Sequence, residues 1–225
     1  MTTTNKPAMI RVWDLPTRLF HWLLVGLFVF MIVSGESGDD LIEWHFYGGY
    51  LLSGLILFRI VWGLLGTRYA RFTSFIFNPV YTLKYSLRMV KGKAEPHYGH
   101  NPAGGVMVIL LLGLLSVQVA SGLVTTDDVL WNGPFYDSVS EEITDLAGQV
   151  HHLLQEALII LVVLHVAAIV FHRLKYKDAL VPAMFHGNKP AHDKTAGIGA
   201  FSWIGLVVAV ALATGWVGYL FSLPL

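Results

Sequence analysis

Five long apolar segments, separated by polar loops, constrain this chain more than any other feature. They lie at residues 17–34, 46–65, 103–124, 150–171 and 200–221. Each approaches the roughly 20 residues that an α-helix needs to cross the hydrocarbon core of a bilayer, and a backbone inside lipid must satisfy its own hydrogen bonds, as a helix does. Hydrophobic residues make up 55% of the 225-residue chain and charged residues only 13%, which is unlike a soluble domain. The sequence therefore predicts an all-α integral membrane protein.

Lysine and arginine are confined to alternate connections between these segments. The loops at 35–44 and 125–149 contain neither, and every basic residue lies in the remaining regions except Arg59, which is inside the second segment. Because short cytoplasmic loops collect Lys and Arg, we expect the N-terminus inside the cell and the C-terminus outside. The two outer loops are instead acidic, with the carboxylates of Glu36, Asp39, Asp40, Glu43, Asp127, Asp128, Asp137, Glu141, Glu142 and Asp145.

The chain has no cysteine. Disulfides, cysteine-ligated iron–sulfur clusters and covalent haem attachment are thereby excluded, so that any haem has to be held by side-chain ligation alone. Residues 1–14 are mostly polar, and no small-residue cleavage site follows the first apolar segment. We therefore expect no cleaved signal peptide.

Four histidines lie within or at the ends of the apolar segments, where an unpaired polar ring is costly. His151 and His165 are fourteen residues apart in one segment, which returns them to nearly the same helix face at a rise of about 21 Å. His21 belongs to the inner level with His165, and His45 to the outer level with His151. Since histidine is a common haem ligand, this pattern predicts two stacked haem sites with two histidine ligands each.

Two other histidines compete with this assignment. His152 is thirteen residues from His165, a spacing that turns it about 140° away on a helix, so His151 is favoured as the outer ligand. His172 lies on the same face as His165 and is the alternative inner ligand, although its place beside Arg173 better suits contact with a haem propionate or a quinone. The remaining histidines are expected to be solvated or to cap helices; they are His97, His100, His186 and His192.

Arg59 lies within the second apolar segment, and an arginine there needs an anion or water. A haem propionate would supply the anion. Alternatively, the long side chain reaches the inner membrane surface by snorkelling. The sequence leaves both possibilities open.

Two connecting regions are predicted to form short surface helices. After Asn78-Pro79, apolar residues recur at helical spacing beside Lys84, Arg88 and Lys91, which is typical of an amphipathic helix on anionic lipid. In the outer loop 125–149, Ser138 and Glu141 have the spacing of a capping box, which favours a separate helix there. No sequence repeat is apparent among the five apolar segments.

Several short motifs follow one another along residues 10–180. They are Val12-Trp13-Asp14, Pro16-Thr17-Arg18, Phe20-His21-Trp22, Arg59-Ile60-Val61-Trp62-Gly63, Ala70-Arg71-Phe72 and Gly99-His100-Asn101-Pro102, together with His151 and His165. In combination they resemble the bacterial di-haem cytochrome b family, which includes the b-type membrane subunit of nickel–iron hydrogenases and related b-561-type cytochromes.

The resemblance implies a four-helix transmembrane haem-binding bundle over residues 1–180, in the bacterial inner membrane. It implies two non-covalent b haems, with His21 and His165 as the inner ligands and His45 and His151 as the outer ligands, the same assignment that the spacing gives. Residues 181–199 would form a cytoplasmic linker. The apolar segment within 200–221 would be an extra C-terminal transmembrane helix, packed peripherally or against a partner subunit.

The expected function is respiratory electron transport between a periplasmic redox partner, of hydrogenase or cytochrome c type, and the membrane quinone pool. His100, Asn101 and His172 are the candidate quinone-site residues. One alternative is a superoxide:quinone oxidoreductase, which the acidic outer loops disfavour because they would repel an anionic substrate. Another is a haem-free membrane anchor for a partner complex, which the four histidines disfavour. No nucleic-acid partner is expected, and the direction of electron flow does not follow from the sequence.

Overall fold

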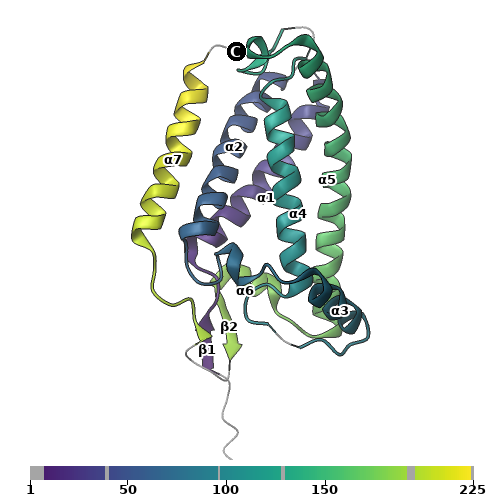
Figure 1. Ribbon diagram of the computed structural model, residues 1–225, viewed down its shortest axis with the longest axis vertical. Coiled ribbons are helices and arrows are strands. Elements are labelled where there is room, and N and C mark those ends of the chain that lie inside the picture. Colours follow the sequence, from purple (N-terminus) through teal and green to yellow (C-terminus); the bar gives the residue numbers. More distant parts are fainter. Residues whose placement is uncertain (1–7, 39–40, 96, 128–129, 192–195, 224–225) are drawn as a thin grey trace, which may run out of the picture.

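The computed structural model describes residues 8–38, 41–95, 97–127, 130–191 and 196–223. Its five long helices are α1 (Leu15–Glu36), α2 (Ile42–Leu65), α4 (Pro102–Gly122), α5 (Glu141–Lys175) and α7 (Trp203–Ser222). All five are long and apolar enough to cross a membrane (Figure 1). The prediction of an all-α membrane protein with five spans is confirmed.

Helices α1, α2, α4 and α5 form a bundle, and α7 stands at its edge beside α2 (Figure 1). The centre of the bundle is apolar: Leu52 and Ile56 of α2 are buried against Leu115 of α4 and Leu158 of α5. Many other large apolar side chains are exposed along the helices. Exposed apolar flanks around a packed centre are what a bundle surrounded by lipid requires.

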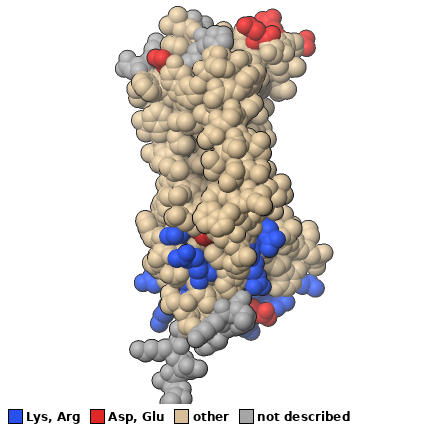
Figure 2. Space-filling view, turned by 90° about the vertical axis from the view of Figure 1, so that its left-hand side faces the viewer, with Lys and Arg blue, Asp and Glu red and all other residues tan. Residues whose placement is uncertain are grey.

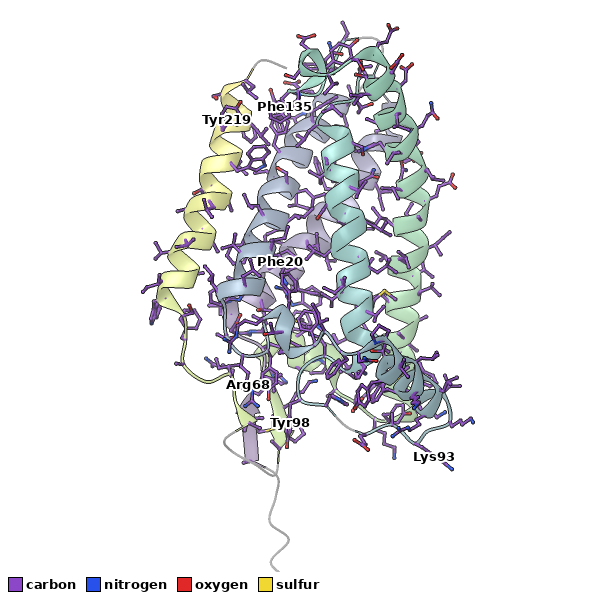
Figure 3. All side chains as sticks on the ribbon, in the orientation of Figure 1. Phe20, Arg68, Lys93, Tyr98, Phe135 and Tyr219 are labelled. Atoms are coloured by element: carbon purple, nitrogen blue, oxygen red, sulfur yellow. The ribbon has the colours of Figure 1, made fainter. Side chains whose placement is uncertain are left out.

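Helix α7 is held against α2 by a close approach of the two backbones. A Cβ atom added at Gly54 would lie 2.3 Å from Cγ2 of Val217, so only glycine fits there. The residues that precede Gly54 and Val217 also make contact: Trp216 Nε1 donates a hydrogen bond to Ser53 Oγ at 2.9 Å. Near the outer end, the ring of Phe135 stacks on Tyr219 (Figure 3). The predicted peripheral packing of the fifth span is confirmed.

The inner end of the bundle is closed by chain segments that are distant in the sequence. Strand β1 (Ala8–Arg11) pairs antiparallel with β2 (Asn188–Ala191), which follows the short helix α6 (Leu180–His186). The region expected as a linker therefore contains most of α6 and all of β2. Val12 and Trp13 are buried against this layer, so that the start of α1 is fixed against the segment that follows α5.

Asp14 connects the start of α1 to the end of α2. Its carboxylate caps α1 by accepting from the backbone N–H of Thr17 at 2.7 Å, and it also accepts from Trp62 Nε1 at 3.3 Å and from the Thr67 hydroxyl. The carboxylate is only 2% exposed. A buried charge is tolerated when several donors replace its water, so the three contacts explain why this carboxylate can be buried.

Helix α3 (Pro79–Val90) begins at its N-cap Asn78, where the side chain accepts from Val80 N. The predicted helix is confirmed. Val80, Leu83 and Leu87 are each more than half exposed, next to the basic residues of the same helix. An exposed apolar stripe with neighbouring cations is what a helix lying on a membrane surface presents.

The separate surface helix expected in the outer loop is not formed, and that prediction was wrong. Ser138 ends a single 3₁₀ turn, η3 (Tyr136–Ser138), and Ser140 is the N-cap of α5. From Glu141 the helix continues without interruption for 35 residues, because no proline or loop separates its polar first turns from its apolar span. The outer acidic residues Glu141 and Glu142 thus occupy the first turn of α5, where they complement the helix dipole.

Charged side chains collect at the two ends of the bundle (Figure 2). Lys and Arg surround the end that carries the strands and α3, and a group of Asp and Glu lies at the opposite end. We refer to these as the inner and outer ends. Asp39, Asp40 and Asp128 of the predicted outer acidic group lie outside the described residues.

Substituting Gly54 with leucine should destabilise the fold by forcing α7 away from α2. We expect a loss of about 1–3 kcal/mol in the free energy of unfolding, the usual cost of overpacking. The matched control is Gly113→Leu, because no atom lies within 4 Å of a Cβ added there. Unfolding in mixed micelles, followed by tryptophan fluorescence, measures both; equal stabilities would contradict the α2–α7 contact.

Candidate functional site

His45 of α2 and His151 of α5 face each other at the outer end of the bundle. Their ring centroids are 6.2 Å apart and their planes are inclined by 81°. Both rings line one mostly apolar cavity between α1, α2, α4 and α5. Bonds from a histidine nitrogen to a first-row metal such as zinc are about 2.0 Å long, so this separation leaves room for one metal atom between the two rings.

Each of these rings is held by a backbone carbonyl of the neighbouring helix. His45 Nδ1 lies 3.1 Å from the carbonyl oxygen of Met31, and His151 Nδ1 lies 2.9 Å from that of Gln118. A carbonyl only accepts, so Nδ1 carries the proton in both rings. The lone pair of the neutral imidazole is then on Nε2, which is the form in which histidine ligates a metal.

A serine and a glycine accompany each carbonyl. The Ser34 hydroxyl is 3.1 Å from His45 Nδ1, and the Ser121 hydroxyl is 3.1 Å from His151 Nδ1. A Cβ added at Gly35 would lie 3.1 Å from Cε1 of His45, and one at Gly122 would lie 2.8 Å from Cε1 of His151. The rings therefore rest directly on the glycines.

Sequence reasoning missed this arrangement, although the sequence carries a signal for it. The dipeptide Ser-Gly occurs near the end of α1 (34–35) and at the end of α4 (121–122), although it also occurs at 37–38 and 53–54. A dipeptide is too short to be recognised as a repeat in the sequence. It becomes meaningful only in the structure, where 34–35 lies beside His45 and 121–122 lies beside His151.

His152 also lines the outer cavity, but it is placed differently from His151. Its ring centroid is 6.5 Å from that of His151, and its side chain is exposed where His151 is partly buried. The structure thus brings His151, and not His152, together with His45.

The inner end gathers His21 of α1, His165 of α5, Arg59 of α2 and His100, which lie close enough for their charges to interact. His21 Nδ1 is buried and has no hydrogen-bond partner among the described residues. The inner pair is thus less fully held by protein than the outer pair, where both Nδ1 atoms are bound.

Arg59 is buried among aromatic rings. Only 3% of the residue is exposed. Its guanidinium carbon lies 5.0 Å from the ring centre of Phe72 and 5.9 Å from that of Phe20. Phe20 lies in the inner part of the bundle (Figure 3). Its Nη1 has no hydrogen-bond partner in the described part of the chain. The snorkelling alternative is therefore not what the structure shows, and the side chain still needs an anion.

The residues expected at a quinone site have three different environments. His100 lies between the rings of Trp13 and Phe75, each at 4.7 Å between centroids. Asn101 is the N-cap of α4 and accepts from Gly104 N at 2.8 Å. His172 Nδ1 is paired with Asp178 Oδ2 at 2.9 Å near the end of α5.

The expectation that His100 is solvated or capping was wrong. Burial, together with the positive charges of Arg59 and Lys189, lowers the pKa of His100 to about 3, so the imidazole is neutral at physiological pH. The cause is tertiary, since Trp13 covers the ring from the other end of the sequence. His186 is exposed, and its Nδ1 accepts a hydrogen bond from Asn188 N at 3.0 Å, beyond the end of α6. His192 lies outside the described residues.

Comparison with known protein families matches most of the chain. The profile of the family described as prokaryotic cytochrome b561 matches residues 12–187, which include the outer pair, the inner group and all four helices of the bundle. The chain belongs to the prokaryotic cytochrome b561 family. Helix α7 lies beyond the matched residues.

Curated relatives of this b561-family cytochrome carry one name. A protein of Rhodobacter capsulatus named "Probable Ni/Fe-hydrogenase B-type cytochrome subunit" is 22% identical over 86% of this chain and 86% of its own length. A protein of the same name from Azotobacter chroococcum mcd 1 is 24% identical over 84% of this chain and 92% of its own length. Another from Cupriavidus necator is 22% identical over 81% of this chain and 87% of its own length. The chain is thus similar to hydrogenase b-type subunits over most of its length.

The residues present fit the haem b that the b561 family implies. Each histidine pair offers two ligands, whereas a bare zinc ion takes four from the protein in a structural site, and no group of three or more His, Asp, Glu or Cys among the described residues could hold a metal ion. A haem brings its remaining iron ligands with it. Its carboxylates are also the kind of anion that the unpaired Nη1 of Arg59 requires.

The glycine beside His151 gives a sharp test of the outer site in this cytochrome. Leucine at position 122 should push the imidazole away from its carbonyl, because even a Cβ would lie 2.8 Å from the ring, and bound haem should fall. Gly113→Leu, on the same helix with free space around it, should keep the wild-type haem content. The pyridine haemochrome spectrum of each purified variant measures this, and equal haem in both would contradict the arrangement.

Proposed function

We propose that this cytochrome transfers electrons across the membrane through two b haems, an outer haem ligated by His45 and His151 and an inner haem ligated by His21 and His165. The observation that carries the proposal is the outer pair: two imidazoles 6.2 Å apart, each with its Nδ1 directed to a backbone carbonyl. When bound, a haem iron accepts and releases one electron by changing between its ferric and ferrous states.

The protein contributes orientation and a mostly apolar environment. The carbonyls of Met31 and Gln118 fix the outer rings, and hydrogen bonds of this type raise the basicity of a ligating histidine. Leu52, Leu115 and Leu158 are buried together and line the outer cavity. Arg59 would hold a carboxylate of the inner haem.

The charge distribution supports an orientation with the N-terminus in the cytoplasm and the C-terminus in the periplasm. The acidic end then faces the periplasm, and β1, β2 and α3 lie at the cytoplasmic surface, where α3 would rest on anionic lipid. In this orientation the outer haem is the one that a periplasmic redox protein reaches.

The partner we propose is a periplasmic redox complex of hydrogenase type, because the curated relatives are named as hydrogenase subunits. A cytochrome c is the second candidate. The quinone would react at the inner end near His100, which lies in the group with Arg59. The capping bond of Asn101 and the hydrogen bond between His172 and Asp178 give Asn101 and His172 structural roles of their own.

Two alternative functions are less well supported. A superoxide:quinone oxidoreductase would bring an anionic substrate to a surface with exposed Glu141, Glu142 and Asp145, which repels it. A haem-free membrane anchor would have no use for two imidazoles held in the ligating tautomer. An absorption spectrum of the purified protein separates the anchor from the cytochrome.

Replacing single histidines tests the ligand assignment. His151→Ala should reduce the haem content from two per chain to one, because the outer iron loses an axial ligand, and His165→Ala should do the same for the inner haem. The matched control is His152→Ala, which should leave both haems in place. Haem-to-protein ratios and low-temperature spectra measure the outcome, and loss of a haem from the His152 variant would contradict the assignment.

A salt series tests the outer face as the docking surface for a partner with a basic face. Electrostatic steering should make association fast at low salt and slower as the Debye length falls from about 10 Å at 0.1 M to 3 Å at 1 M. Changing the exposed residues Asp137, Glu141, Glu142 and Asp145 to amides should flatten this dependence while the haem spectra stay unchanged. A basic cytochrome c in stopped-flow is the probe, and a rate indifferent to salt would reject the acidic face as the electron entrance.

A further inference from the structure

The two histidine levels have opposite electrostatic surroundings. At the inner level, the charge of Arg59 is buried inside the bundle, and Arg18 has a buried Nε without a hydrogen-bond partner among the described residues. The outer cavity, in contrast, has no Lys or Arg among the described residues that line it. Its charged member is Asp127, beside neutral polar side chains such as Tyr50 and Gln118.

The charge of Arg59 is not neutralised by an ion pair within the described residues. The carboxylate of Asp14 is near enough to offset part of this charge, but it lies beyond ion-pair distance of Arg59 and is bound instead by Thr17 N, Trp62 Nε1 and the Thr67 hydroxyl. The other groups around Arg59 are aromatic rings and the neutral His100. A cation that is 3% exposed acts through a medium of low dielectric, where charges interact far more strongly than in water.

A nearby cation changes the reduction potential of an iron in a definite direction. Ferric iron carries one more positive charge than ferrous iron, so a fixed positive charge disfavours the ferric state and raises the potential. A nearby carboxylate has the opposite effect, and burial keeps either effect from being screened by salt.

We infer that Arg59 makes the inner haem the more easily reduced of the two, so that electrons pass downhill from the outer end to the inner end. The inference rests on the proposed function, and it adds the direction that the proposed function leaves open. With both haems bound, one electron at a time would pass from the outer iron to the inner iron, and no proton would move between them. The periplasmic redox partner would supply the electrons. A quinone at the inner end would take up two of them, together with two protons from water, to form a quinol.

The test is a redox titration of the purified cytochrome with haem absorption as the readout. Wild-type protein should show two midpoint potentials. In Arg59→Met the higher midpoint should fall by at least the amount that corresponds to a tenfold change in the one-electron equilibrium constant, 59 mV, and the lower one should stay in place. Methionine is chosen because replacing a buried charge with an apolar side chain of similar volume is commonly tolerated.

Two further variants separate the charge of Arg59 from its packing. Arg59→Lys keeps the positive charge and should recover most of the wild-type potential. Arg68→Met removes an exposed arginine from the same end of the molecule (Figure 3), and water should screen that change so that neither midpoint moves. Unchanged midpoints in Arg59→Met, or equal shifts in Arg59→Met and Arg68→Met, would overturn the inference.

The single-haem variant His151→Ala assigns the midpoints and protects the test against loss of haem from Arg59→Met. The haem that this variant retains should titrate at the higher wild-type potential. If it titrates at the lower one, the inferred direction is wrong although the two-haem proposal stands. If wild-type protein contains fewer than two haems per chain, the proposed function fails instead.

Discussion

The arrangement of the outer site depends on one kind of contact, a hydrogen bond from a histidine ring to the backbone carbonyl of a neighbouring helix. A helical carbonyl has a second lone pair besides the one used within the helix, but the side chain four residues later normally crowds it. Here that residue is glycine in both helices: Gly35 follows Met31, and Gly122 follows Gln118. The missing Cβ lets the imidazole reach the carbonyl. The same contact therefore sets the tautomer, fixes the ring and joins α1 to α2 and α4 to α5.

The inner end differs in that its histidine nitrogens and its arginine are not bound by the protein in the way that the outer Nδ1 atoms are. Arg59 Nη1, His21 Nδ1 and His100 Nδ1 are all buried and unpaired among the described residues. Such groups are costly in an apolar interior, and a cofactor with carboxylates repays the cost. The Asp14 network close by is fully satisfied, so it contributes rigidity without competing for Arg59. The ends differ in two ways: the outer histidines are bound by backbone carbonyls next to an acidic surface, and the inner end holds a buried cation. This difference underlies the inferred direction of electron transfer.

Helix α7 adds a fifth span to a bundle that is complete without it. It covers α2 through the Gly54 contact and the Trp216 bond to Ser53, and it contacts Phe135 of the outer loop. Phe135 N also donates to Leu123 O, and Leu123 lines the outer cavity. The fifth helix thus supports the loop beside the outer site, which gives it a structural role whether or not a partner subunit also contacts it.

The amino-acid sequence by itself determined the five spans, because lipid permits little but helices of that length, and the charge difference between the two ends. It also placed His151 and His165 on one face of α5, since a helical period fixes directions within one element. Only the tertiary structure decided what depends on contacts between elements. These features are the burial of Arg59 and His100, the pairing of β1 with β2 and the Ser-Gly contacts with the outer histidines. The contacts involved connect residues that are from 11 (Ser34 and His45) to 183 (Ala8 and Ala191) positions apart in the sequence. Periodicity describes the face of a single helix, but which faces meet, and which carbonyl a ring can reach, is set by the packing of the whole bundle.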